Sequence, residues 1–134
     1  MAMQISNWLS AQFLNSALRG AAFTPPSTVY IALYTSDPTA ADTGTEVSGG
    51  AYARQAITFA APSLEAGKQT VKNAADVEFP VATADWGLVT HIGLRTAAMG
   101  GNLMWFKALD NPRTIQSGDR PKFLKDSTLV RFAQ

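Results

Sequence analysis

The chain contains no cysteine and only one histidine, His91. Without thiols it can form no disulfide, no thiolate nucleophile and no Cys-ligated zinc site. His91 stands in the run LVTHIGL, the chain has no G-x-S-x-G elbow, and no motif ties this imidazole to a carboxylate or a hydroxyl. The sequence therefore predicts no enzyme, no catalytic residues and no cofactor, and His91 is interpreted as a satisfied or interface histidine.

Charge is scarce. Charged residues make up 16% of the 134 residues, and the formal net charge is +1. Such a chain lacks the field that nucleic acid or an acidic membrane would require. No run approaches the roughly 20 apolar residues of a membrane span, and the first residues lack the basic start of a signal peptide. We therefore expect no nucleic-acid partner, no membrane span and a product that is made and kept soluble.

The first 20 residues predict one helix. Residues from about 4 to 19 contain neither proline nor glycine, Arg19 falls in the last turn, and Gly20 is a natural helix C-cap. This segment is interpreted as residues 1–20, either part of the same domain or a docking element.

Apolar side chains occur on two sides of the predicted helix. At about 100° per residue, Trp8, Leu9 and Phe13 fall on one broad face. Leu14 and Leu18 form a second stripe nearly opposite. The helix is therefore either sandwiched within its own domain or docked into a neighbouring subunit, and these five residues are candidate interface residues.

After Pro25 and Pro26 the pattern changes to short β segments, beginning with the run TVYIALY at 28–34. Its alternation predicts a central strand covered on both sides. Gly100-Gly101 predicts a tight hairpin. We expect residues 21–134 to form a single antiparallel β-sandwich domain, jelly-roll-like, with about seven or eight strands. The later strands are predicted at 53–59, 76–80, 88–96, 102–109, 113–116 and 127–133.

The stretch 35–50 carries Asp37, Asp42 and Glu46 among threonines and glycines. These oxygens could bind Ca²⁺, although the spacing fits no EF-hand. A solvated turn explains the same residues without an ion, and we prefer it. Arg54 follows this loop, and its guanidinium could form bidentate contacts with Glu46 or with a carboxylate of an adjacent subunit. Both residues are candidate interface residues.

Two further groups of side chains could meet a partner. Large aromatics could stack on sugar rings of a glycan, although core packing is the default interpretation. The basic residues near the C-terminus favour a subunit face, with Arg131 as the interface candidate, over an RNA groove, because no aromatic-rich RNA motif accompanies them. The aromatics are Tyr52, Trp86, Trp105 and Phe106, and the basic residues are Arg113, Arg120, Lys122, Lys125 and Arg131.

Three motifs stand out: LYTSDPT, GTEVSGGAYARQ, and the pattern between Ala82 and Gly93 in which ATADWG is followed by VTH and a glycine. Together they resemble a family of small bacteriophage virion proteins usually labelled tail fibre proteins. The resemblance extends from the N-terminal helix almost to the C-terminus. It implies a structural component of a tailed phage or prophage, self-associating and without catalytic residues.

From this resemblance and the composition we expect a non-enzymatic virion protein of a tail, tail fibre or baseplate, made in the cytoplasm of the bacterial host. Its expected partners are other copies, with a trimer as the suggested homo-oligomer, and other phage structural proteins of the tail, baseplate or capsid. Two alternatives stay open. One is a capsid decoration protein that stabilises the phage head, and the other is a glycan-binding host-recognition module.

Overall fold

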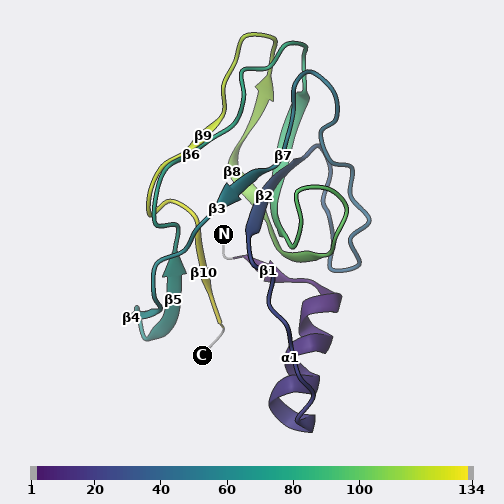
Figure 1. Ribbon diagram of the computed structural model, residues 1–134. Helices are drawn as coiled ribbons and strands as arrows, with labels where there is room; N and C mark the ends of the chain where they lie inside the picture. The colour runs from purple at the N-terminus through teal and green to yellow at the C-terminus, as the bar shows by residue number, and fades with distance from the viewer. Residues whose placement is uncertain (1–2, 133–134) are drawn as a thin grey trace.

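The computed structural model describes residues 3–132 (Figure 1). Within this range the protein is mainly β with one helix near the N-terminus, as the sequence predicts. The elements in chain order are β1 (Gln4–Ile5), α1 (Asn7–Arg19), β2 (Val29–Tyr34), β3 (Gln55–Ile57), β4 (Ser63–Glu65), β5 (Lys68–Lys72), β6 (Val77–Glu78), β7 (Gly87–Arg95), β8 (Leu103–Ile115), β9 (Lys122–Phe123) and β10 (Leu129–Arg131).

A five-stranded antiparallel sheet in the order β1-β8-β7-β2-β3 forms the centre of the molecule. Its strand β2 is the predicted central strand, and residues 31–34 are all buried. Ile31 and Leu33 enter the main core, whereas Ala32 and Tyr34 enter a second apolar cluster. Because successive side chains of a strand point to opposite faces, β2 is covered on both sides.

A three-stranded sheet, β10-β5-β4, and a two-stranded ribbon, β6-β9, complete the fold. Figure 1 shows them beside the central sheet, on the side of the molecule away from the 35–54 loop. Val77 and Phe79 from the ribbon region and Val130 from β10 enter the same core cluster as Ile31. The arrangement is sandwich-like, as expected, with one core shared by the sheets.

The structure differs from the sequence prediction in the number of strands, because ten are present in residues 3–132 instead of seven or eight. The segments predicted at 102–109 and 113–116 belong to one strand, β8. The hairpin β4-β5 was not predicted. It turns through Ala66-Gly67, both at positive φ (52° and 77°). Alanine in place of the usual Asn or Asp hides this turn from a sequence reading.

Strand β8 is irregular in its middle. Its register against β7 passes from Val89 opposite Arg113 to His91 opposite Ala108, so Thr90 faces the four residues 109–112. One of them, Pro112, has no backbone N–H for a ladder. On the other side of β8, β1 pairs only with Trp105 and Phe106.

The helix begins later than predicted, because Gln4 and Ile5 form β1 and Ser6 is the N-cap. The Ser6 hydroxyl accepts a hydrogen bond from Leu9 N (3.1 Å) and donates one to Leu103 O (2.5 Å). The Ser6 N–H also donates to Met104 O (2.8 Å). This buried serine therefore satisfies a free N–H of the helix and fixes its first turn on β8.

The helix ends as predicted. Gly20 adopts the left-handed conformation (φ 71°), and Ala21 N donates to Asn15 O (3.1 Å). Glycine accommodates this conformation without steric cost. Figure 1 shows α1 extending away from the end of the sheet at which it begins. In residues 3–132 no helix is long and apolar enough to cross a membrane.

Candidate interaction surfaces

The loop after β2 is held to the β7-β8 turn by Arg54. Its Nε and Nη2 atoms donate to Glu46 Oε2 (2.8 Å) and Oε1 (2.7 Å), and its Nη1 donates to the carbonyls of Ala97 and Gly100 (2.8 Å each). The bidentate contact between Arg54 and Glu46 predicted from the sequence is therefore confirmed within one chain. Their role at a subunit interface stays a prediction.

Glu46 also binds a tyrosine. The Tyr52 hydroxyl donates to Glu46 Oε2 (2.6 Å) and accepts from Leu33 N (3.0 Å). Burial raises the pKa of Glu46, but the hydrogen bonds from Arg54 and Tyr52 outweigh it, and the net pKa lies below 4.5. Burial and the bond to Glu46 raise the pKa of Tyr52. The carboxylate is therefore charged and the phenol neutral at neutral pH.

The depressed pKa of Glu46 predicts a loss of stability in acid. The folded state holds the proton of Glu46 less tightly than the unfolded state. Ionised Glu46 therefore contributes its full stabilisation of the folded state above pH 4.5, and this stabilisation is lost as the pH falls through the folded pKa. Urea unfolding at neutral pH and at about pH 3 should show a smaller acid-induced loss for Glu46→Gln than for the parent protein. Equal losses in the two proteins would contradict this assignment.

A second arginine, which the sequence analysis did not single out, holds the same loop. Arg95 Nη1 and Nη2 donate to Asp42 Oδ1 (2.8 Å) and Oδ2 (3.0 Å). Arg95 also donates to the Tyr34 hydroxyl (2.9 Å) and to Gly101 O (3.1 Å). Burial lowers the pKa of Arg95, but the bonds to Asp42 and Tyr34 raise it overall. The sequence offered one feature that could have identified Arg95, which is its position at the end of a predicted strand and before a predicted Gly-Gly turn.

The Gly-Gly turn that both arginines contact is wider than predicted. It spans residues 96–102, closed by Thr96 N donating to Asn102 O (3.1 Å). Gly100 and Gly101 both adopt positive φ (62° and 68°), a conformation that glycine reaches without steric cost. A Cβ at Gly101 would lie 2.6 Å from Thr96 Oγ1, so the second glycine also permits a close approach.

The acidic loop is thus a packed connection between β2 and β3. Asp37 Oδ1 accepts from Thr39 N (2.9 Å), as in an Asx turn. Gly44 allows a close backbone approach, since a Cβ there would lie 2.6 Å from Pro38 Cα. The preferred explanation, a solvated turn, holds for Asp37, whereas Asp42 and Glu46 are held by Arg95 and Arg54 instead. Residues 3–132 contain no group of three or more His, Asp or Glu side chains able to hold a metal ion.

His91 lies on β7, on the face of the sheet that the acidic loop covers. Its Nδ1 lies 2.8 Å from Thr90 Oγ1, and its Nε2 lies 4.0 Å from Asp37 Oδ1. The imidazole is half-buried, and Gln4, Lys107 and Phe106 lie around the same small depression. His91 is therefore a partnered histidine, and its predicted role at an interface stays a prediction.

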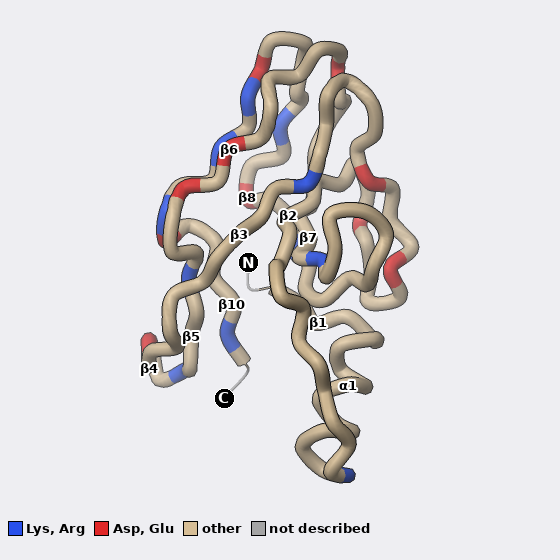
Figure 2. Tube along the Cα trace, viewed as in Figure 1, with Lys and Arg blue, Asp and Glu red and all other residues tan. Residues whose placement is uncertain are grey.

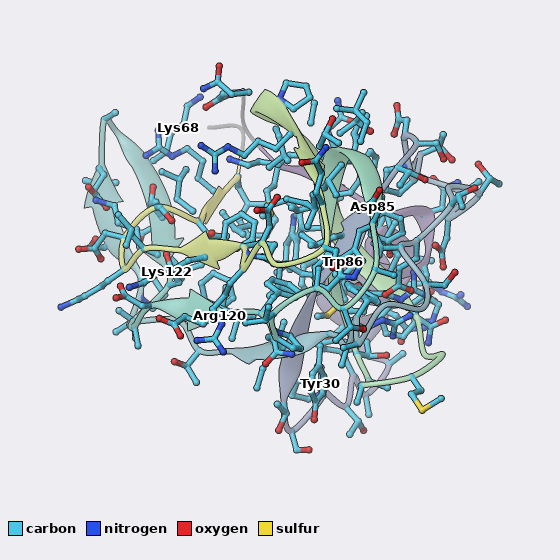
Figure 3. The ribbon with its side chains drawn as sticks, turned by 90° about the horizontal axis from the view of Figure 1, so that it is seen from above. Tyr30, Lys68, Asp85, Trp86, Arg120 and Lys122 are labelled. Carbon is cyan, nitrogen blue, oxygen red and sulfur yellow. The ribbon has the colours of Figure 1, made fainter. Side chains whose placement is uncertain are left out.

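Of the four aromatics proposed for sugar stacking, two are buried as the default interpretation expects and two are half-buried. Trp86 is buried, donates from Nε1 to Gly50 O (2.8 Å) and packs edge-on against Tyr52 at 5.4 Å between ring centroids. Figure 3 shows Trp86 among the interior side chains. Phe106 is buried in the second cluster. Tyr52 and Trp105 are half-buried, and each lines a depression of the surface.

Two of the five basic residues singled out near the C-terminus, Arg120 and Lys122, lie close to carboxylates. Lys122 Nζ lies 3.5 Å from carboxylate oxygens of Asp76 and of Glu78, and Arg120 Nη1 lies 3.5 Å from Glu78. Blue and red segments accordingly alternate along the β6-β9 ribbon in Figure 2, and Figure 3 shows Arg120 and Lys122 near one another. Arg131 lies on β10, and its buried Nε has no hydrogen-bond partner in the described part of the chain. This surface is a mixed-charge one.

The two apolar stripes predicted on the helix differ in burial. Leu9 is fully buried, and Trp8 and Phe13 are half-buried against Phe23, at 6.4 and 5.6 Å between ring centroids. The other candidates are exposed, Leu14 at 59% and Leu18 at 77%. The inner stripe therefore packs within the chain, and the outer stripe faces outward.

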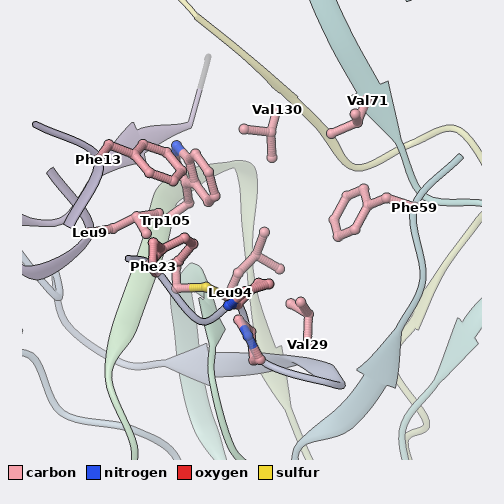
Figure 4. A pocket seen from close by; sticks show the side chains of 12 residues that line it. Leu9, Phe13, Phe23, Val29, Phe59, Val71, Leu94, Trp105 and Val130 are labelled. Atoms are coloured by element: carbon pink, nitrogen blue, oxygen red, sulfur yellow. The ribbon is translucent and has the colours of Figure 1, made fainter. Parts of the chain in front are cut away.

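An apolar cleft lies between α1 and the β10-β5-β4 sheet. It has a volume of about 270 Å³. Figure 4 shows Phe13 and Trp105 on one side and Phe59 and Val71 on the other, with Leu94 between them. All twelve lining residues are apolar: Leu9, Phe13, Phe23, Pro25, Pro26, Val29, Phe59, Val71, Leu94, Met104, Trp105 and Val130. We call this feature the apolar cleft.

Comparison with protein families places this β-rich chain among the phage fibre proteins. The matching family model is described as Podophage GP4 fiber I protein gp80 and covers residues 4–131, so the chain belongs to that family. The match includes α1 and β10, and it confirms the resemblance predicted from the sequence motifs. No curated protein matched the chain. Family membership indicates a structural component of the virion.

Proposed function

We propose that this protein is a non-enzymatic, self-associating subunit of a phage tail fibre. The observation that carries the proposal is the outer stripe of α1. Leu14 and Leu18 are among the most exposed large apolar side chains, while the opposite side of the same helix packs into the core. An exposed apolar stripe on a rigid, anchored element marks an interaction site.

The proposal also agrees with how the helix is built. Ser6 and β1 fix the first turn of α1 to β8, so the stripe is presented in a defined orientation. In Figure 2 the helix carries no charged residue except Arg19 at its end. A partner of this surface is therefore apolar, as another copy of the chain or an apolar patch of a fibre protein would be.

The position on the virion is tested by immunogold labelling of purified particles with an antibody against this chain. Gold on the tail or its fibres is the expected result. Gold over the head would replace the fibre assignment with capsid decoration, which the sequence analysis left open. A particle preparation from a phage lacking this gene serves as the matched negative control.

Self-association is tested by Leu18→Lys. Because Leu18 is 77% exposed, the substitution should leave the free energy of unfolding within about 0.5 kcal/mol of the parent. It should dissociate the oligomer, since a lysine would be desolvated in an apolar contact. Sedimentation velocity reads the mass of each variant. Leu88→Lys, at an apolar position on β7 that is 51% exposed, is the control that should retain the parent's mass.

A further inference from the structure

We propose that Met99 is a modification site, at which hydrogen peroxide oxidises the thioether to a sulfoxide while the chain stays folded. Met99 is 87% exposed, more than any other large apolar side chain in residues 3–132. Met3 and Met104, the other methionines of this range, are 7% and 4% exposed. Peroxide in solution therefore meets the side chain of Met99 directly and reaches the other two only when the structure opens.

The β7-β8 turn keeps Met99 exposed. Its two neighbours in the chain, Ala98 and Gly100, are too small to cover its side chain. Arg54 and Arg95 hold the backbone on both sides of it, through hydrogen bonds of 2.8, 2.8 and 3.1 Å to three carbonyl groups of the turn. Because these bonds use backbone oxygens, they do not depend on the oxidation state of the sulfur.

The oxidation needs no residue other than the methionine. A lone pair of the Met99 sulfur attacks one oxygen of hydrogen peroxide, and the O–O bond breaks as the S–O bond forms. The other oxygen leaves as water after a proton passes to it from the first. The sulfur is oxidised by two electrons and the peroxide is reduced by two, so the products are the sulfoxide and one water molecule.

The reaction alters a depression between the acidic loop and the β7-β8 turn. This depression has a volume of about 410 Å³, and Met99 lines it together with Glu46, Tyr52 and Arg54. A thioether is flexible, apolar and a weak hydrogen-bond acceptor, whereas a sulfoxide is polar and chiral. Oxidation therefore replaces an apolar part of the depression's wall with a polar one, which disfavours any partner that contacts Met99 through apolar groups.

The two buried methionines provide internal references. Met3 and Met104 both belong to the main core cluster. A sulfoxide at either position would place a polar oxygen among apolar side chains, so the folded state resists it. Their oxidation requires local opening, which should make it at least about 10-fold slower than that of Met99.

Peptide mass spectrometry measures the selectivity. The full chain is treated with hydrogen peroxide at neutral pH, and samples stopped at intervals are digested. Met99 should gain one oxygen at least about 10-fold faster than Met3 and Met104, and this difference should disappear in urea, where burial is lost. Fragment ions distinguish Met3 from Met1, which lies outside the described residues. Equal rates for Met99 and Met104 in the folded protein would overturn the proposal.

Met99→Leu is the matched control, because leucine keeps an apolar side chain of similar volume. This variant should lack the fast oxidation, whereas Met104→Leu should retain it. Protein oxidised at Met99 should unfold at the same urea concentration as the parent, and its amide NMR shifts should change only near the depression, in residues 46–54 and 96–102. A lower unfolding midpoint, or shifts spread through β7 and β8, would contradict a modification that leaves the chain folded. Methionine sulfoxide reductases should restore the parent spectrum.

Discussion

Replacing Trp86 with alanine is expected to lower the free energy of unfolding by about 3–5 kcal/mol, as for other buried tryptophans and phenylalanines. Trp86 is 5% exposed and packs against Tyr52 and Phe79. Its Nε1 satisfies the carbonyl of Gly50, at the end of the acidic loop. The substitution would leave a cavity and remove one of the two hydrogen bonds that the Gly50 carbonyl accepts, since Thr83 N still donates to it (3.0 Å). Urea unfolding followed by far-UV circular dichroism measures the change.

Trp86→Phe is the control, because it keeps most of the apolar volume and removes only the hydrogen bond to Gly50. It should lose about 1–2 kcal/mol, less than the alanine variant. A fully stable Trp86→Ala protein would contradict the buried placement and return Trp86 to the set of aromatics available for glycan stacking. Because Trp86 is buried, any loss of glycan binding in Trp86→Ala should follow from unfolding and not from a lost contact with sugar.

Arg95→Met should be the second large effect, at about 2–3 kcal/mol of lost stability. The side chain of Arg95 is 8% exposed, and methionine would fill much of its volume without its five donors. Asp42 would lose two hydrogen bonds, and Tyr34 and Gly101 of the 96–102 turn would each lose one. The loss stays below that of a fully buried ion pair because the Asp42 side chain is 35% exposed and can be solvated.

Hydrogen exchange measured by mass spectrometry locates the effect. In Arg95→Met, amide protection should fall in the 35–54 loop and the 96–102 turn before it falls in β7. Arg113→Met, at an exposed position on β8, is the matched control and should change neither the unfolding curve nor the exchange of the loop. Unchanged protection of the loop in Arg95→Met would show that Arg54 suffices to hold it.

The parts of this fold that the sequence predicted are those in which local pattern and burial agree. The alternation in 28–34 identified a strand with two buried faces, and Gly20 identified the end of the helix. The charge and spacing of Arg54 and Glu46 suggested their pairing, because a loop that begins and ends at neighbouring strands returns its ends to the same region. Helical periodicity alone predicted two apolar stripes, but only the structure shows that the stripe with Leu14 and Leu18 is the exposed one.

The parts that the sequence did not predict depend on contacts between distant segments. Ser6 caps the helix while it binds Leu103, 97 residues away, and no local pattern distinguishes that serine from others in the segment. Arg95 meets Asp42 across 53 residues. The short strands β6 and β9 are defined mainly by their pairing with each other. The cleft arises only when α1 and β5 are placed side by side.

The irregularity of β8 limits how the subunits of a fibre can polymerise. An exposed strand edge recruits further strands when its backbone N–H and C=O groups follow a regular spacing. Here four residues face the single Thr90, and Pro112 removes one donor. The edge of β8 that β1 leaves unpaired is therefore a poor template for open-ended, amyloid-like strand addition. Copies held close together on a virion would then join through shaped side-chain surfaces and not through shared β-strands.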